Sequence, residues 1–327
     1  MRCLLQYQVS FPGLGIENLT VNREAFSFNL FGRQLTVFWY GLIFTIAIVV
    51  CIAIALIRAG KYGFSTDDIL DYFLWMIPLI LIGSRIYYVA FEWNQFKGSL
   101  AAIFDLRQGG LAFYGGVIGG MLAVAIAARI KRTKLHRIYD YLAVLIPLGQ
   151  GIGRWGNFFN QEAFGTNTRL PWGMISEGTR RGLAALNPDP ANPLPGLDPH
   201  LPVHPTFLYE FVANMIIFGI LLAVHKRQKR PWTTVLAYFF LYGIVRFFVE
   251  GVRTDSLVFE VFGQTVRISQ LLSAIMVAGS ILAFIVSRAR DAKRQRLIAA
   301  MQAGSGQLPE YSAADDSDPG EVKTARP

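Results

Sequence analysis

Long runs of apolar residues alternate with short polar and basic segments along most of the chain. Most of these runs approach the roughly 20 residues that a helix needs to cross a lipid bilayer. We predict seven membrane-spanning helices, at residues 35–57, 69–91, 111–130, 138–152, 205–224, 233–249 and 268–286. The fourth run is the shortest, and it passes directly into a polar segment. The pattern therefore predicts an all-α integral membrane protein.

Basic residues gather in the segments that would lie on one side of such a membrane. Clusters follow the first, third, fifth and seventh runs, among them "RIKRTKLHR" at 129–137 and "HKRQKR" at 225–230. Loops rich in lysine and arginine remain in the cytoplasm. The clusters therefore place the N-terminus outside and the C-terminus in the cytoplasm.

This topology divides the chain into three parts. Residues 1–34 form an extracytoplasmic N-terminal segment, and residues 35–287 form the seven-helix membrane domain. Within that domain, the long loop at 154–204 is rich in Pro and Gly and is expected to form an extracytoplasmic cap. Residues 288–327 form a cytoplasmic tail, which we expect to be largely disordered because its composition is polar.

Composition agrees with a membrane location, since 53% of the residues are hydrophobic and only 16% are charged. The net charge of +9 comes from the short basic clusters. We interpret it as a signal of topology and of contact with anionic headgroups, and not of nucleic-acid binding. The two cysteines, Cys3 and Cys51, show no metal-binding pattern. No nucleotide-binding or metalloprotease motif occurs, so we expect neither a cofactor nor a metal.

The segment "GRWGNFFNQEAFG", at 153–165, places polar side chains at the outer end of the fourth run. Arg154, Asn157 and Gln161 are spaced i, i+3 and i+7, so they share one face of a continuing helix. One interpretation is a helix end whose polar residues reach towards the membrane interface. The other is a polar groove that binds a ligand at the outer membrane surface. The segment by itself leaves both interpretations open.

A second polar stripe lies inside the sixth run, in "YGIVRFFVEGVR". Tyr242, Arg246, Glu250 and Arg253 recur at i, i+4, i+8 and i+11 and share one helical face. An arginine inside a span faces the bundle interior or a water-filled cavity and marks a functional site by default. The structural alternative is an ion pair between Arg246 and Glu250, which does not exclude a function.

A third arginine, Arg85, lies in the second run with Tyr88 and Glu92 on the same face. Three spans would then each bring an arginine to the outer half of the membrane. Guanidinium groups in a low-dielectric cavity need anions, and they match phosphate groups with two parallel hydrogen bonds. Neighbouring glutamates supply part of that charge, and an anionic lipid headgroup is expected to supply the rest.

Two further motifs carry weaker signals. In "GGLAFYGGVIGG" the glycines are spaced for close helix packing, and Tyr114 is the one hydroxyl-bearing residue. His204 opens "HPTFLYE", where a capping or interfacial histidine is a more ordinary role than a catalytic base.

Taken together, these motifs resemble the prolipoprotein diacylglyceryl transferase family. "GRWGNFFNQEAFG" is similar to the signature of that family at every fixed position. The resemblance extends through "WYG", "GSRIYY", "GGLAFYGG", "HPTFLYE" and "YGIVRFFVEGVR", and so covers roughly residues 37–286.

The resemblance implies an enzyme of the bacterial cytoplasmic (inner) membrane that begins lipoprotein maturation. Such an enzyme moves the diacylglyceryl group of phosphatidylglycerol to the lipobox cysteine thiol of a preprolipoprotein signal peptide, and glycerol 1-phosphate leaves. Its partners would be these two substrates and the lipid bilayer. Two alternatives from other classes are a transporter with an arginine-lined anion site and a non-catalytic lipid-binding scaffold. The chain shows no internal repeat, and its polar residues cluster on the outer side only, which argues against a transporter.

The resemblance also implies roles for individual residues. Arg154 and Arg246 would be essential, and we place Tyr114 and Tyr242 with them as candidate catalytic residues. Residues expected to bind phosphatidylglycerol are Arg154, Asn157, Glu162, Gly165, Arg246, Tyr40, Arg85 and Glu250. His204 is a possible site residue. Some members of the family carry a histidine where this chain has Tyr114, so a mechanism with that histidine as base is in doubt here.

Overall fold

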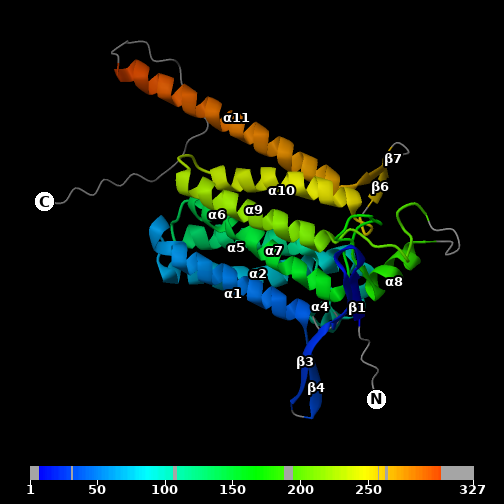
Figure 1. The fold of residues 1–327 in the computed structure, drawn as a ribbon. Helices are drawn as coiled ribbons and strands as arrows, with labels where there is room; N and C mark the ends of the chain where they lie inside the picture. The colour runs from blue at the N-terminus through cyan, green and yellow to red at the C-terminus, as the bar shows by residue number, and fades with distance from the viewer. Residues whose placement is uncertain are drawn as a thin grey trace. The chain divides into compact units, whose positions relative to one another are not determined.

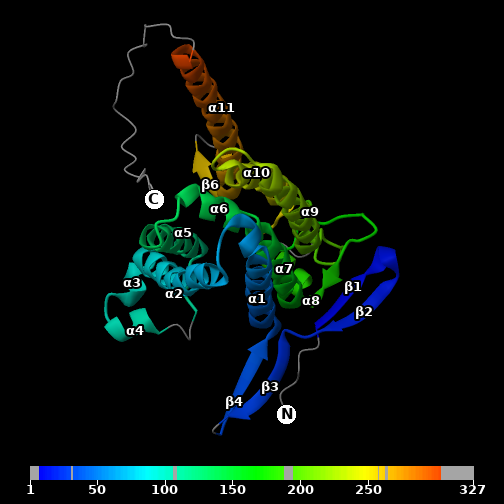
Figure 2. The same cartoon turned by 90° about the vertical axis from the view of Figure 1, so that its left-hand side faces the viewer.

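The structure is a computed structural model that describes residues 7–30, 32–105, 109–187, 194–256, 258–261 and 264–302. Six of the described helices are long and apolar enough to cross a membrane. They are α1 (Trp39–Ala59), α2 (Thr66–Phe91), α5 (Phe113–Ile130), α9 (Thr206–Arg227), α10 (Thr233–Val252) and α11 (Ile268–Gln302). Figures 1 and 2 show α1, α2, α5, α9 and α10 running beside one another as a bundle. The prediction of a mainly helical, multi-pass membrane protein is confirmed.

The fourth predicted span corresponds to two shorter helices, α6 (Leu135–Ala143) and α7 (Leu145–Asn160). The chain turns at Val144, which is fully buried in a cluster with Ile217 and Leu221 of α9. Neither helix is long enough to be counted with the six. The count of seven spans therefore stays a prediction, in which α6 and α7 together supply the fourth.

Glycines bring α2 and α5 into close contact, as their spacing predicts. Gly115 and Gly119 of α5 lie against backbone atoms of Gly83 and Leu79 of α2, so that a Cβ at either position would overlap a carbonyl oxygen of α2. Ala123 and Ala127 continue the buried face of α5. This pair of helices packs backbone against backbone, which small residues permit in a membrane.

Short strands form much of the region outside the bundle, which the all-α prediction did not include. The strands β1 (Tyr7–Phe11), β2 (Ile16–Val21) and β5 (Ile175–Ser176) make one antiparallel sheet in the order β2-β1-β5. Two hairpins stand apart from this sheet. They are β3 (Glu24–Leu30) with β4 (Arg33–Phe38), and β6 (Val258–Val261) with β7 (Gln264–Arg267). The first span consequently begins at Trp39, four residues after the predicted start.

The described part of the loop at 154–204, for which we predicted a cap, packs with neighbouring elements around a shared core. The helix α8 (Glu177–Leu186) begins with a capping box at Ser176, where the Ser176 hydroxyl accepts a hydrogen bond from the backbone of Thr179. The core joins the N-terminal strands to the end of α7 and the start of α9, through Val9, Val21, Phe158, Phe164, Met174, Leu183, Val203 and Phe207. The cap therefore covers the end of α7, where the polar segment lies.

The last helix differs from its prediction at its C-terminal end. α11 continues to Gln302, so residues 288–302 are helical although we expected the segment from 288 onwards to be largely disordered. The helix crosses the boundary between two compact units, the second of which begins at Leu282. Long straight side chains such as Arg and Lys favour helix, which explains why a polar sequence continues it. The rest of the tail lies outside the described residues.

Candidate active site

The helix α7 carries the first polar residues of the site on its last turns. Arg154 and Asn157 lie one turn apart, and Arg154 Nη1 is 3.5 Å from Asn157 Oδ1. The helix ends at Asn160 because Gln161 adopts a left-handed conformation, with φ of 54°. Gln161 therefore leaves the shared face that its spacing predicted, and its Oε1 instead accepts a hydrogen bond from the backbone of Gly178 in α8.

A buried carboxylate on α9 joins the arginines of three segments. Glu210 Oε2 lies 2.5 Å from Arg154 Nη2 of α7. Its other oxygen lies 3.6 Å from Arg246 Nη1 of α10 and 3.3 Å from Arg253 Nη1, just beyond the end of α10. The side chain of Glu210 is only 2% exposed. One anion therefore holds three guanidinium groups together at the point where α7, α9 and α10 converge.

A second buried carboxylate, Glu250, pairs with Arg246 within α10. Arg246 Nη2 lies 2.6 Å from Glu250 Oε2, the pair that the i, i+4 spacing predicts. The Glu250 side chain is 2% exposed, whereas that of Arg246 is 18% exposed and that of Arg154 is 21% exposed. The carboxylates of Glu210 and Glu250 thus lie behind the guanidinium groups of Arg154 and Arg246, which are the more accessible partners of these pairs.

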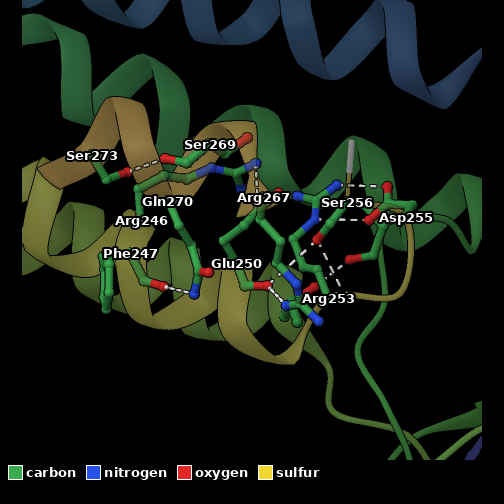
Figure 3. A network of polar contacts seen from close by, with 12 residues as sticks. Arg246, Phe247, Glu250, Arg253, Asp255, Ser256, Arg267, Ser269, Gln270 and Ser273 are labelled. Atoms are coloured by element: carbon green, nitrogen blue, oxygen red, sulfur yellow. Dashed lines mark hydrogen bonds and ion pairs between the residues drawn. The ribbon is translucent and has the colours of Figure 1, made fainter. Parts of the chain in front are cut away.

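The arginine cluster continues to the loop after α10, as Figure 3 shows. Arg253 makes a two-pronged ion pair with Asp255, with Nε 2.9 Å from Oδ1 and Nη2 2.7 Å from Oδ2. Burial by itself would raise the pKa of Asp255, but the hydrogen bond and the charge of Arg253 outweigh it and hold that pKa below its usual range. Arg267 donates to the backbone carbonyl of Glu250. Four arginines thus face three carboxylates, which leaves one excess positive charge in this group.

Asn157 connects the cluster to the outer end of the polar segment. Its Nδ2 and that of Asn160 each lie 3.1 Å from Oε1 of Glu162, which is exposed. Asn157 therefore reaches an arginine with one atom of its amide and a carboxylate with the other. The predicted grouping of Arg154, Asn157 and Glu162 is present in the structure.

Comparison with known sequences identifies the family to which the chain belongs. A family model described as prolipoprotein diacylglyceryl transferase matches residues 26–286. The chain belongs to the prolipoprotein diacylglyceryl transferase family. Its relatives include proteins named phosphatidylglycerol–prolipoprotein diacylglyceryl transferase from Finegoldia magna, 39% identical, and from Clostridioides difficile, 38% identical. These alignments cover 78% and 79% of this chain, respectively, and 93% of each relative.

Gly165, the last glycine of the family signature, lies where three segments meet. Its N–H donates to the carbonyl of His204, and the N–H of Thr166 donates to the carbonyl of Val252. A Cβ at Gly165 would lie 2.7 Å from His204 Cβ and 2.9 Å from Val252 O. The structure therefore explains Gly165 by close packing, because no larger residue fits between α9 and α10 here.

Both predicted tyrosines of the first and sixth spans are close to the signature. Tyr40 packs on Gly156, whose Cβ would lie 2.7 Å from the Tyr40 ring. Tyr242 stacks on Tyr238 with ring centroids 5.5 Å apart, and it interacts electrostatically with Arg154, Glu210 and Arg246. Tyr242 is therefore placed directly beside the arginines, and Tyr40 is placed against α7 at Gly156.

His204 belongs to a short hydrogen-bonded chain that joins the 154–204 loop to the start of α9. Trp172 Nε1 donates to the Tyr209 hydroxyl at 2.8 Å, and the hydroxyl lies 3.1 Å from His204 Nδ1. The indole N–H of Trp172 can only donate, so the Tyr209 oxygen accepts this bond and keeps its own hydrogen. That hydrogen can be donated to Nδ1 of His204, which favours the neutral tautomer with its hydrogen on Nε2. Burial lowers the pKa of His204. The arrangement favours a neutral histidine that donates a hydrogen bond over one that accepts a proton at Nδ1.

Arg85 and Tyr114 lie in a different environment from the three arginines around Glu210. The Arg85 guanidinium donates five hydrogen bonds of 2.7–3.0 Å to backbone carbonyls of Ala102, Ile103, Asp105, Gly109 and Gly110. Tyr114, at the start of α5, is 40% exposed and contacts the rings of Tyr87 and Phe113. The expectation that Arg85 joins Arg154 and Arg246 in one cluster is not met in the structure, because the loop between α2 and α5 uses all its N–H groups.

Sequence reasoning missed Glu210 as a site residue. The motif "HPTFLYE" begins with His204 and ends with Glu210, and only His204 was predicted as a candidate site residue. The available signal was a carboxylate inside an apolar run, since an ionisable residue within a span marks a functional site by default.

Proposed function

We propose that this protein transfers the diacylglyceryl group of phosphatidylglycerol to the lipobox cysteine thiol of preprolipoproteins, with release of glycerol 1-phosphate. The family membership and the names of the relatives support this transferase activity. Nothing in these comparisons favours the alternative of an arginine-lined transporter.

The observation that carries the proposal is the arrangement of Arg154 and Arg246. They come from separate helices, share the buried Glu210 carboxylate, and keep about a fifth of their side chains accessible. A phosphodiester bound on the accessible side would face two guanidinium forks, each able to donate two parallel hydrogen bonds. The accessible guanidinium groups of Arg154 and Arg246 would face the single negative charge of a phosphatidylglycerol headgroup.

The same arrangement suits the chemistry of the transfer. The sulfur of the acceptor cysteine attacks the carbon of the diacylglyceryl group that is bonded to the phosphate oxygen. The bond between that carbon and the oxygen breaks. The electron pair of that bond remains on the phosphate oxygen, so negative charge increases where the arginines lie. Guanidinium groups fixed in advance by Glu210 and Glu250 stabilise such charge without reorganisation during the reaction. The thiol proton passes to solvent or to the departing phosphate.

Arg154 and Arg246 also favour the reactive form of the acceptor. A free cysteine has a pKa of about 8.5, and only the thiolate is a good nucleophile. A nearby positive charge stabilises the thiolate, and each pKa unit of depression corresponds to about 1.4 kcal/mol. The same two residues therefore hold the phosphate and lower the cost of ionising the thiol.

Transfer by the purified protein tests this proposal directly. The protein is reconstituted in vesicles with phosphatidylglycerol and a lipobox peptide, and mass spectrometry measures the peptide. We expect the cysteine of the peptide to gain the mass of a diacylglyceryl group with phosphatidylglycerol as donor, and little gain with phosphatidylethanolamine, whose headgroup is zwitterionic. No mass gain with any anionic donor would refute the transferase, and equal turnover with both donors would refute recognition by net charge.

The proposal includes the placement in the membrane. We place the protein in the bacterial inner membrane with seven spans, with α6 and α7 as the fourth, the N-terminus and the cap outside and the C-terminus in the cytoplasm. Single cysteines labelled from outside in intact cells test this orientation. We expect labelling within 154–204 and none at 129–137 or 225–230. Labelling of the 225–230 loop from outside would reverse the assignment.

Tyr114 is expected to help position the substrate without being an obligatory base. Among the described ring contacts, Tyr114 meets only Tyr87 and Phe113. We expect Tyr114→Phe to retain measurable turnover and Tyr114→His to be tolerated, in steady-state assays across pH. If Tyr114→Phe is folded, binds lipid and is as inactive as Arg154→Ala, then Tyr114 is the base.

A further inference from the structure

The hairpin formed by β3 and β4 has one mainly apolar face, on which Leu30 pairs with Arg33 at the turn, and one mainly polar face, which carries Phe38 at its base. The strand register pairs Phe28 with Leu35 and Phe26 with Val37, so these four side chains point to the same side. The pairs between them, Ser27 with Thr36 and Asn29 with Gln34, point to the other side. The rings of Phe26 and Phe28 lie 6.2 Å apart, which confirms that they share a face.

The apolar face is uncovered. Phe26 is 53% exposed, Phe28 is 44% exposed, and Leu30 and Leu35 are 45% and 43% exposed. A two-stranded hairpin has no core of its own and is only marginally stable in water. Contiguous apolar surface of this kind marks a contact with a protein or a membrane. The hairpin therefore requires a partner for this face.

The hairpin is continuous with a membrane-spanning helix. β4 ends at Phe38 and α1 begins at Trp39, without an intervening loop. The N–H of Trp39 donates to the carbonyl of Arg23, which closes the base of the hairpin against the start of the helix. Figure 1 shows the hairpin extending across the direction of the bundle helices, and not along it. An element in that position runs along the membrane surface at the level where α1 enters the bilayer.

We propose that the apolar face of the β3–β4 hairpin lies in the lipid of the membrane leaflet that α1 enters, with its polar face in the aqueous layer. Continuity with α1 favours lipid over a second protein, because β4 ends where this apolar helix begins, and the first turns of the helix expose Tyr40 and Phe44. Interfacial amphipathic elements bury phenylalanine and leucine at the boundary between headgroups and acyl chains. Three of the four paired apolar side chains are Phe26, Phe28 and Leu35. The inference is independent of the transferase activity; only the name of the leaflet, the outer one, depends on the proposed orientation.

Adjacent residues on opposite faces provide a matched test. Phe28→Cys and Asn29→Cys are prepared separately in full-length protein whose native cysteines are replaced by alanine, and each carries a nitroxide label in phosphatidylglycerol-containing vesicles. Power saturation compares access of oxygen, which concentrates in lipid, with access of a water-soluble nickel chelate. We expect the oxygen-to-nickel accessibility ratio at position 28 to exceed that at position 29 several-fold. A matching thermal unfolding temperature shows that each variant is folded.

Three other outcomes would overturn the proposal. Equal access of the nickel chelate at both positions would place the whole hairpin in water. Exclusion of both reagents at position 28 would show that protein covers the face. Dipolar broadening between labels at position 28 would identify that protein as a second copy of the chain.

Discussion

Arg154→Lys and Arg246→Lys are each expected to lower kcat by about a hundredfold or more, the loss that follows removal of a fixed hydrogen-bond donor to developing charge. Lysine keeps the positive charge but loses the planar fork that donates two parallel hydrogen bonds to phosphate. The single ammonium group of lysine also cannot contact Glu210 and a bound phosphate simultaneously with separate nitrogen atoms, as a guanidinium group can. Transfer to the lipobox peptide in phosphatidylglycerol vesicles measures the effect.

Arg181→Lys provides the control for this experiment. Arg181 pairs with Glu177 on the surface of α8, and both side chains are about half exposed. The same change of residue type there should leave turnover and unfolding temperature unaltered. Wild-type activity in Arg154→Lys and Arg246→Lys would mean that charge alone is sufficient and that two-pronged recognition of the phosphate is wrong.

Glu210→Gln is expected to damage both stability and turnover. The carboxylate is 2% exposed and lies between three guanidinium groups, so its loss leaves buried positive charges without their counter-ion. Breaking a buried ion pair by removal of one partner costs about 3–5 kcal/mol. Thermal unfolding in detergent measures this effect, and transfer assays on the folded protein measure turnover.

The kinetic constants separate positioning by Glu210 from a purely structural role. Loss of one negative charge leaves the cluster more positive, so the KM for the anionic donor should not rise. kcat should fall, because Arg154 and Arg246 lose the group that orients them. Glu177→Gln, in an exposed pair, is the matched control and should change neither constant. Normal kcat in folded Glu210→Gln would show that the arginines do not need this carboxylate.

The sequence predicted the helices and the pairing of Arg246 with Glu250 well, for physical reasons. A bilayer demands long apolar runs, so five of the predicted spans match α1, α2, α5, α9 and α10 closely in position. Arg246 and Glu250 lie on one helix, where spacing alone determines that they meet. Contacts within one helix are readable from the sequence because the helix has a fixed period.

Contacts between elements were not readable in the same way. Glu210 meets Arg154 across two helices, and no spacing along the chain encodes that encounter. Arg85 looked equivalent to the other two arginines, yet the loop that follows α2 folds back and uses its guanidinium. Which arginines gather is a result of tertiary packing, and residue type alone does not decide it.

The strands were missed for a different reason. A search for long apolar runs overlooks strands, whose signal is strict alternation over a few residues. "AFSFNL" and "RQLTVF" show that alternation in β3 and β4, on either side of a short turn. The signal was present, but it is weak beside the neighbouring helix α1, whose 21 residues are almost all apolar.

The hydrogen bonds of Gly165 and Thr166 have a mechanical consequence. Two consecutive backbone amides tie the end of the signature segment to the start of α9 through His204 and to the end of α10 through Val252. At this level the two helices cannot slide or separate without breaking at least one of these hydrogen bonds. Lateral admission of a two-chained lipid between α9 and α10 would therefore proceed by a hinge, with the tied end as its pivot and the widest opening farther along the helices. The arginines, which lie near that pivot, would keep their mutual spacing while the acyl chains enter.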